Sequence, residues 1–242
     1  MKKRLFPLSL FPQFGLLVLI LFSLPLWGQK SRHEGWARQL QQYVSPDGQV
    51  DYAAWKKDQG PLNNYILSLE ADPPQAHWKK NEKLAFWINA YNALTVQLIL
   101  NNYPLQSIKD LEDPWDNPLF TTSNQVLSLG EIEHEILRKL DEPRIHFAIN
   151  CASASCPKLA REPYTPRGLD EQLKRATAAF LCDTTRNQLE GETLRLSKIF
   201  LWFSEDFGGK KELLAFLRKH TQLPIPNEAR IRYLKYNWAL ND

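Results

Sequence analysis

Apolar residues recur at helical spacing through most of this chain of 242 residues. The longest such segment runs from about Asn81 to Asn101, and the Tyr103-Pro104 pair that follows predicts its end. One side of this predicted helix carries Leu84, Ile88, Tyr91, Thr95 and Leu98. We expect further helices at Glu34–Val44, Leu62–Leu69, Ser128–Leu140, Pro166–Leu181, Ser197–Phe207 and Lys210–His220.

Strand patterns are fewer and shorter. The clearest is Ile145–Cys151, where Ile145, Phe147 and Ile149 alternate with smaller or polar residues. Shorter strands are expected at Val50–Tyr52, Thr193–Leu196 and Ile231–Tyr236, with loops at 113–124 and 152–165. Because the strands do not alternate with helices as regular βαβ units, we predict an α+β fold, mainly helical with a small sheet, in a single compact domain.

The N-terminus has the pattern of an export signal. Lys2, Lys3 and Arg4 precede an apolar stretch from Phe14 to Leu24, and small Gly28 offers a cleavage point. We therefore predict a signal peptide over 1–28, an N-terminal helical part over 29–77 and a main body over 78–242. An uncleaved membrane anchor is the alternative, and it would give the chain its only membrane contact. Either way, the expected location is the periplasm or the extracellular space.

Charge does not favour a nucleic-acid partner. The formal net charge is +3, and the three basic residues at positions 2–4 account for all of it, since 1–28 contain no acid. The remainder is electrically balanced and shows no clustered basic face of the kind that binds nucleic acid. The expected partner is an envelope ligand or protein whose identity the sequence does not give.

The three cysteines leave two interpretations open. In an oxidising compartment Cys151 and Cys156 can pair across a short loop, which leaves Cys182 over. Alternatively Cys151 is a nucleophile, because it lies where a predicted buried strand enters a loop of small polar residues. That second role requires a neighbouring group that stabilises the thiolate.

Two histidines are candidate bases for such a thiol. His146 is close in sequence, but five residues of extended strand would place it roughly 17 Å away and on the opposite face. His134 is the better candidate, because it shares the polar side of its helix with Glu131 and Arg138, and that helix leads into the Cys151 strand. A structural role for His146, bonded inside the sheet or under a helix, is equally open.

Two asparagines interrupt the apolar character of the long helix. Asn89 and Asn92 are three residues apart, and amides in such a segment are costly unless they have hydrogen-bond partners. They are expected either to bond a neighbouring backbone or to orient a catalytic group.

Motifs for a cofactor or metal are weak. The spacing of His146, Cys151 and Cys156 matches no zinc pattern, and the chain has neither a CxxC nor an HExxH sequence. It also has no glycine-rich phosphate loop. We therefore predict no cofactor and no metal.

Several blocks, in order, resemble domain-of-unknown-function family 547, which occurs in exported bacterial proteins and in plant proteins. They are Leu84–Thr95, Ile132–Arg138, Pro143–Pro157, Tyr164–Pro166 and Leu196–Phe207, within about residues 78–220. Plant-type members keep the counterparts of His146 and Cys151 but often lack that of Cys156. The resemblance therefore implies that a Cys151–Cys156 bond is not a family requirement, which favours a site role for Cys151.

Two functional hypotheses follow. The first is a non-catalytic binding or scaffold module of the cell envelope, in which the histidine and the asparagines form a buried polar network. The alternative is a thiol-dependent hydrolase or transferase acting on a peptide or amide-like envelope component. In that enzyme Cys151 attacks, His134 is the base, and Asn89 or Asn92 orients or stabilises.

Overall fold

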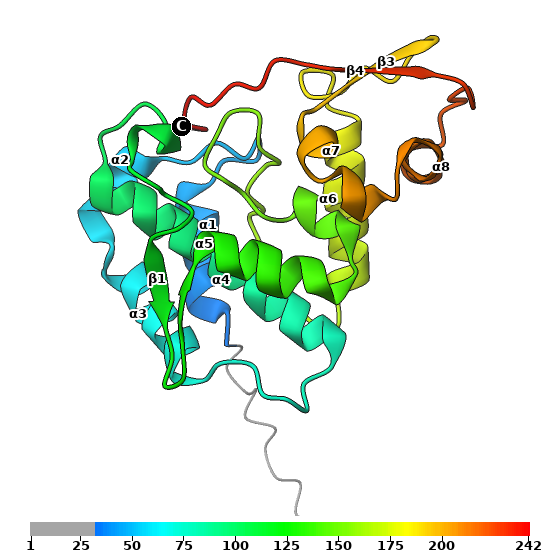
Figure 1. The fold of residues 1–242 in the computed structure, drawn as a ribbon. Helices are drawn as coiled ribbons and strands as arrows, with labels where there is room; N and C mark the ends of the chain where they lie inside the picture. The colour runs from blue at the N-terminus through cyan, green and yellow to red at the C-terminus, as the bar shows by residue number, and fades with distance from the viewer. Residues whose placement is uncertain (1–31) are drawn as a thin grey trace, which may run out of the picture. The chain divides into compact units, whose positions relative to one another are not determined.

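The computed structural model describes residues 32–242, which form one compact unit (Figure 1). The predicted export segment, residues 1–28, lies outside these described residues. Within them no helix has both the length and the apolar character that crossing a bilayer requires. The helical elements are α1 Glu34–Tyr43, α2 Tyr52–Trp55, η1 Lys56–Asp58, α3 Gly60–Ala71, α4 Lys80–Asn102, η2 Ile108–Asp110, α5 Leu129–Glu131, η3 Ile132–Leu137, η4 Arg138–Leu140, η5 Pro143–Phe147, α6 Leu169–Leu181, α7 Ile199–Trp202, η6 Ser204–Phe207 and α8 Lys210–Thr221.

Strands are short and form two separate two-stranded sheets. β1, Pro118–Thr121, pairs antiparallel with β2, Val126–Ser128, and β3, Thr193–Leu196, pairs parallel with β4, Arg230–Tyr233. The predicted α+β class with a helical majority is therefore confirmed, although the strands are divided between two small sheets.

Helix α4 is the centre of the larger core. The sequence predicted one apolar side, but the helix is buried on nearly all sides from Leu84 to Leu100. The cause is its position, because α2, α3, α5 and η3 all contact it. Figure 1 shows α5 and the helical turns after it lying alongside α4. A second cluster of buried aromatic and aliphatic side chains joins α6, α7, η6 and α8.

The helix predicted at Ser128–Leu140 is confirmed, and so is its capping box. Ser128 Oγ accepts the backbone N–H of Glu131, and the Glu131 carboxylate accepts the backbone N–H of Ser128. The helix widens to π geometry over η3 and tightens to 3-10 geometry over η4. This helix supplies Glu133 and His134 to the site described below.

The strand predicted at Ile145–Cys151 is wrong. Pro143 and the Glu142 carboxylate, which accepts the Arg144 N–H, begin the 3-10 helix η5, and an irregular segment follows Phe147. Every residue from Ile145 to Asn150 is buried, so the alternation of residue types did not reflect one buried face. The strand predicted at Val50–Tyr52 is also wrong, because Val50 makes only an isolated bridge to Val44 and Tyr52 begins α2.

Candidate functional site

A cavity of about 230 Å³ lies where both clusters of the core meet the segment after η5. Its walls come from parts of the chain that are far apart in sequence. They are formed by Tyr91, Trp115, Glu133, His134, His146, Ile149, Cys151, Cys156, Pro157, Ile199, Trp202, Phe203, Tyr236 and Trp238. We call this cavity the central pocket. Its aromatic and aliphatic walls and small number of titratable groups are typical of a small-molecule site.

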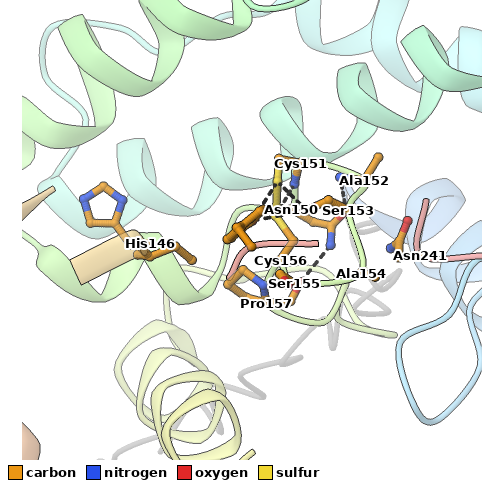
Figure 2. Close-up of a disulfide and its surroundings, with 12 residues drawn as sticks. His146, Asn150, Cys151, Ala152, Ser153, Ala154, Ser155, Cys156, Pro157 and Asn241 are labelled. Carbon is orange, nitrogen blue, oxygen red and sulfur yellow. Dashed lines mark hydrogen bonds between the residues drawn. A yellow bond between two sulfur atoms is a disulfide. The ribbon is translucent and has the colours of Figure 1, made fainter. Parts of the chain in front are cut away.

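A disulfide between Cys151 and Cys156 forms one end of the central pocket (Figure 2). The two Cα atoms are 6.1 Å apart, within the range that disulfides adopt. Cys182, which the pairing leaves over, is free and exposed. Of the two interpretations left open by the sequence, the structure therefore adopts the disulfide.

The loop that carries the disulfide is held by the side chain of Asn92. Its amide nitrogen donates to the carbonyl of Ala148 at 3.0 Å, and its amide oxygen accepts the N–H of Asn150 at 2.8 Å. Both bonds are buried, so they replace water contacts that these groups lose on folding. Asn92 thus fixes the backbone immediately before Cys151.

Further hydrogen bonds hold the loop from within. Asn150 accepts the N–H of Ala152 at 2.8 Å and donates to the carbonyl of Pro157 at 2.7 Å. The Arg186 guanidinium donates to the carbonyls of Ala154 and Cys156 at 2.8 and 2.9 Å. Ala152 has a φ of 58°, a left-handed conformation that costs a non-glycine residue about 1 kcal/mol. These bonds therefore maintain a conformation that the isolated loop would not favour.

Residues near the C-terminal end of the chain cover the loop. The N–H of Ala154 donates to the carbonyl of Ala239 at 2.7 Å, and Ser153 forms a bridge with Leu240. Figure 2 shows Asn241 beside the loop, where its N–H donates to the carbonyl of Ala152 at 3.2 Å. This docking places Tyr236 and Trp238 in the pocket wall.

Hydroxyl groups surround the half-buried Cys151 sulfur. Ser153 Oγ lies 3.3 Å from it and the Tyr236 hydroxyl lies 3.4 Å from it, while Ser153 donates to the Tyr236 oxygen at 3.1 Å. The Tyr236 proton is therefore free to point at the sulfur. Burial raises the pKa of Tyr236 to about 12, which keeps that proton in place at neutral pH.

At the His146 end of the central pocket, away from the disulfide, an ion-pair cluster behind the lining residues is centred on Asp206. Its carboxylate accepts hydrogen bonds from His146 Nε2 at 2.7 Å and from Arg138 Nε and Nη2 at 2.7 and 2.8 Å. Partial burial opposes ionisation, but the bonds from His146 and Arg138 hold the pKa of the Asp206 carboxyl well below its usual range. Burial lowers the pKa of His146, against the pull of Asp206, so this imidazole is neutral at pH 7.

Glu133 adds a second carboxyl group at this end. It is 7% exposed, accepts the Tyr91 hydroxyl at 3.2 Å, and lies 3.9 Å from His146 Nδ1. Burial raises the pKa of Glu133 to about 7. Near neutral pH this carboxyl exists in both protonation states, which is the condition for exchanging a proton with a bound molecule.

His134 is exposed and also lines the central pocket. Its Nδ1 accepts a hydrogen bond from Arg138 at 3.2 Å, as the predicted spacing on the polar side of the helix requires. Burial and the neighbouring Arg138 charge lower the pKa of His134. Glu131, the third residue of that polar group, is engaged in the capping box.

The structure brings three of the five predicted site residues together. Cys151, His134 and His146 all line the central pocket. Within the described residues, the Cys151 sulfur bonds to hydroxyl groups and Cys156 rather than to an imidazole. In Figure 2 the His146 ring stands well apart from the two sulfurs. His146 therefore lines a different part of the pocket, where it is bonded to Asp206.

The two predicted asparagines act behind the pocket. Asn89 donates to the carbonyls of Ala85 and Tyr164, both at 2.8 Å, and accepts the N–H of Tyr164 at 3.0 Å. Like Asn92, it is therefore a buried clamp between α4 and a distant loop. Of the two alternatives from the sequence, backbone bonding is the one the structure shows.

Sequence reasoning missed Glu133, Asp206 and Tyr236. Glu133 had one usable signal, because its helix places it beside the inward-facing Ile132 and Ile136. Asp206 and Tyr236 had none, since they lie 60 residues from His146 and 85 residues from Cys151, respectively. Within residues 32–242, no group of three or more His, Cys, Asp or Glu side chains is arranged to hold a metal ion.

A family comparison supports the resemblance seen in the sequence. Residues 75–181 match the model of the family described as "Protein of unknown function, DUF547". These residues form a DUF547 domain. No curated protein and no solved structure gives a significant match to the chain. The DUF547 match includes Glu133, His146 and both disulfide cysteines, whereas Asp206 and Tyr236 lie beyond it.

Proposed function

We propose that this DUF547 protein is an exported binding module of the cell envelope that holds a small ligand in the central pocket. The observation that carries the proposal is the make-up of that pocket. Aromatic side chains from several segments enclose it, and titratable groups line one end. A concave, mostly apolar cavity with a few converging polar groups is the usual form of a small-molecule site.

The walls indicate the chemistry of the ligand. Trp202 stacks on Trp238 with ring centroids 5.6 Å apart, and the Tyr236 ring lies 4.8 Å from that of Trp202. Such rings favour a flat or apolar group. Glu133 and the neutral His146 at the other end favour a hydrogen-bonding group without full charge. We therefore expect a compact, mainly apolar ligand with one polar end.

The partners of the reactive groups favour binding over catalysis. His146 is bonded to Asp206, Glu133 to Tyr91, and Cys151 to Cys156. A nucleophile and its base normally lie within hydrogen-bond reach of each other. Here each group is engaged with a different neighbour, which supports a network that fixes the shape of the pocket.

A binding measurement with 4-methylphenol, which has one apolar ring and one hydroxyl, tests this proposal. Saturation-transfer NMR is expected to detect its binding, and Trp202→Ala is expected to weaken the affinity by about tenfold through the loss of one aromatic contact. Leu201→Ala is the matched control, because Leu201 is exposed next to Trp202 and does not line the pocket. Equal affinity in the two variants, or no binding to the parent protein, would contradict the proposal.

Export requires its own test. Cells producing the full chain are separated into cytoplasmic, membrane and exported fractions, and the N-terminus of the product is determined by mass spectrometry. A product that begins after residue 28 in the exported fraction supports the proposal. Intact product retained in the membrane supports the anchor alternative, and intact product in the cytoplasm contradicts export.

Thiol-dependent hydrolysis or transfer on a peptide or amide-like envelope component is the second candidate. It is favoured by one observation, which is that Cys151, His134 and His146 line the same pocket. It requires the disulfide to be open, because only a thiolate attacks a carbonyl carbon. Reduced protein should then form an adduct at Cys151 with a peptide chloromethyl ketone, and His134→Ala should slow adduct formation. An equal rate in parent and variant would remove His134 as the base.

A further inference from the structure

We propose that the Cys151–Cys156 disulfide is a reversible redox centre, which a dithiol reduces from the side of the central pocket by attack on Cys151. This activity does not depend on the ligand proposed above. It rests on three features of the loop. Cys151 is the more exposed of the two cysteines, the Cys156 sulfur accepts a hydrogen bond, and hydrogen bonds that involve no sulfur hold the backbone.

The two sulfurs differ in their surroundings. Both cysteines line the central pocket, but Cys151 is half-buried whereas Cys156 is only 4% exposed. The backbone N–H of Cys151 donates to the Cys156 sulfur at 2.8 Å. A hydrogen bond of this kind stabilises negative charge on the sulfur that accepts it. Cys156 is therefore the better leaving group, and Cys151 is the sulfur that an incoming thiolate attacks.

Reduction of the disulfide takes two exchange steps. A thiolate of the dithiol first forms a bond to Cys151 Sγ, the Cys151–Cys156 bond breaks, and its electron pair stays on Cys156. The second thiolate of the dithiol then attacks its own sulfur in the mixed disulfide and releases Cys151 as a thiolate. The dithiol is oxidised to a disulfide by two electrons, and both protein thiolates take up protons from solvent according to pH.

Hydrogen bonds in the loop favour re-formation of the disulfide after reduction. Asn92 fixes the backbone at Ala148 and Asn150, and Arg186 holds the carbonyls of Ala154 and Cys156. None of these bonds involves a sulfur. Because they flank both cysteines, they keep the Cα atoms near their present separation after reduction, and the thiols stay within reach of each other.

The hydroxyl groups beside Cys151 complete the redox centre. Once the disulfide opens, the Tyr236 hydroxyl is placed to donate to the Cys151 thiolate, and Ser153 donates in turn to Tyr236. Tyr236 and Ser153 are therefore positioning residues for the released thiolate. This arrangement raises the fraction of Cys151 that is ionised and able to attack a disulfide.

The first experiment follows the redox state of the native protein in a Cys182→Ser background, which removes the exposed free thiol. The protein is equilibrated in mixtures of reduced and oxidised dithiothreitol, quenched with N-ethylmaleimide and weighed by mass spectrometry. Two added groups per chain are expected under reducing conditions, with unchanged circular dichroism and full reclosure when the oxidised reagent is restored. Reduction only in urea, or only with loss of the folded spectrum, would overturn the proposal.

Two further arms identify the attacked sulfur and the size of the reductant. Oxidised glutathione added to the reduced protein is expected to form a mixed disulfide on Cys151 in a Cys156→Ser variant, and much more slowly on Cys156 in a Cys151→Ser variant. The reverse order would overturn the assignment. In the second arm a dithiol protein of the thioredoxin type replaces dithiothreitol. Reduction of the disulfide by this protein indicates a protein reductant, and reduction by dithiothreitol alone indicates a small-molecule reductant.

The role of Tyr236 is tested by its conservative variant. Tyr236→Phe is expected to slow iodoacetamide alkylation of Cys151 by about tenfold at pH 7, because the thiolate loses a charge-assisted hydrogen bond. Tyr233→Phe is the matched control, since Tyr233 is exposed on β4 and does not line the pocket. Equal rates of Cys151 alkylation in both variants and the parent would show that Tyr236 does not stabilise the Cys151 thiolate.

Discussion

His146 Nε2 donates a hydrogen bond of 2.7 Å to Asp206, although the two residues lie 60 positions apart. Asp206 also accepts two hydrogen bonds from Arg138, so one carboxylate joins three elements, η4, η5 and η6. His146 is almost fully buried against the Phe203 ring, with centroids 4.0 Å apart. The pair therefore fixes the position of the His146 ring in the wall of the central pocket and joins η5 to η6.

Asp206→Asn is expected to destabilise the protein at neutral pH. We expect the free energy of unfolding to fall by about 2 kcal/mol at pH 7, because the charge-assisted hydrogen bonds from His146 and Arg138 are weakened. The depressed pKa of Asp206 contributes stability above the unfolded-state pKa, and this contribution is lost as the pH falls through the folded-state pKa. The difference between parent and variant should therefore shrink below about pH 4.

Urea unfolding followed by circular dichroism between pH 3 and pH 8 measures this effect. Glu205→Gln is the control, because Glu205 neighbours Asp206 but its side chain is 92% exposed and lies 3.9 Å from Arg138. It should change the unfolding free energy by less than about 0.5 kcal/mol. A loss of similar size in both variants would show that the Asp206 cluster carries no special stability.

Glu133→Gln is expected to stabilise the protein at alkaline pH. The folded-state pKa of about 7 lies above the ordinary value, so the folded protein binds the proton more tightly than the unfolded chain. The stability is full below the unfolded-state pKa and is lost as the pH rises through 7. Gln has no proton to lose, and the variant should gain about 2 kcal/mol relative to the parent between pH 5 and pH 8.

The measurement is thermal unfolding across that pH range, with Glu135→Gln as an exposed control on the same helix. Tyr91→Phe gives a second check, because the Tyr91 hydroxyl lowers the pKa of Glu133. Its removal should raise that pKa further and extend the fall in stability to higher pH. An unchanged pH profile in Glu133→Gln would mean that this carboxyl is not the group responsible.

Asn92→Ala is expected to lower the melting temperature strongly. The change leaves the Ala148 carbonyl and the Asn150 N–H without their buried partner, at a cost of about 2–4 kcal/mol. Asn101→Ala, at an exposed position of the same helix, should have little effect. Scanning calorimetry of the two variants measures this effect. A small change in the melting temperature of Asn92→Ala would show that Asn92 does not hold the loop.

The paired change Cys151→Ser with Cys156→Ser is expected to cost about 2 kcal/mol or less. The disulfide closes a loop with a sequence separation of 5, and short loops gain little from cross-linking. The Asn92 and Arg186 bonds also hold the same backbone. Chemical unfolding of the parent in oxidised and reduced states, beside the double variant, checks this. A variant that does not fold would show that the disulfide is structurally essential.

Local patterns in the sequence identified most helices correctly. The helix at Ser128–Leu140 was predictable because its capping box and its apolar side lie within the same dozen residues. The strand prediction at Ile145–Cys151 was wrong for a physical reason. Residues 145–150 are all buried, so the alternation of apolar and polar residues there does not report which side chains face the core. That error also removed the basis for placing His146 and Cys151 on opposite faces of a strand, because both residues line one pocket.

The candidate site was predictable only in part. Cys151 and His134 were found because the reactive residue types lie in short, recognisable segments. The partners that define their chemistry, Asp206 and Tyr236, reach the site through packing of α7, η6 and the segment after β4. Contacts over such separations arise from the tertiary fold, and neither periodicity nor spacing along the chain encodes them.

The docking of residues 237–241 on the cysteine loop has a consequence for how this protein is handled. The stretch that matches the family ends at 181, yet two aromatic walls and the cover over Ala152 come from the last few residues. A fragment trimmed to the family boundaries would expose the disulfide and open the cavity on one side. During folding, likewise, the cavity remains open until residues 236–241 have docked on the cysteine loop.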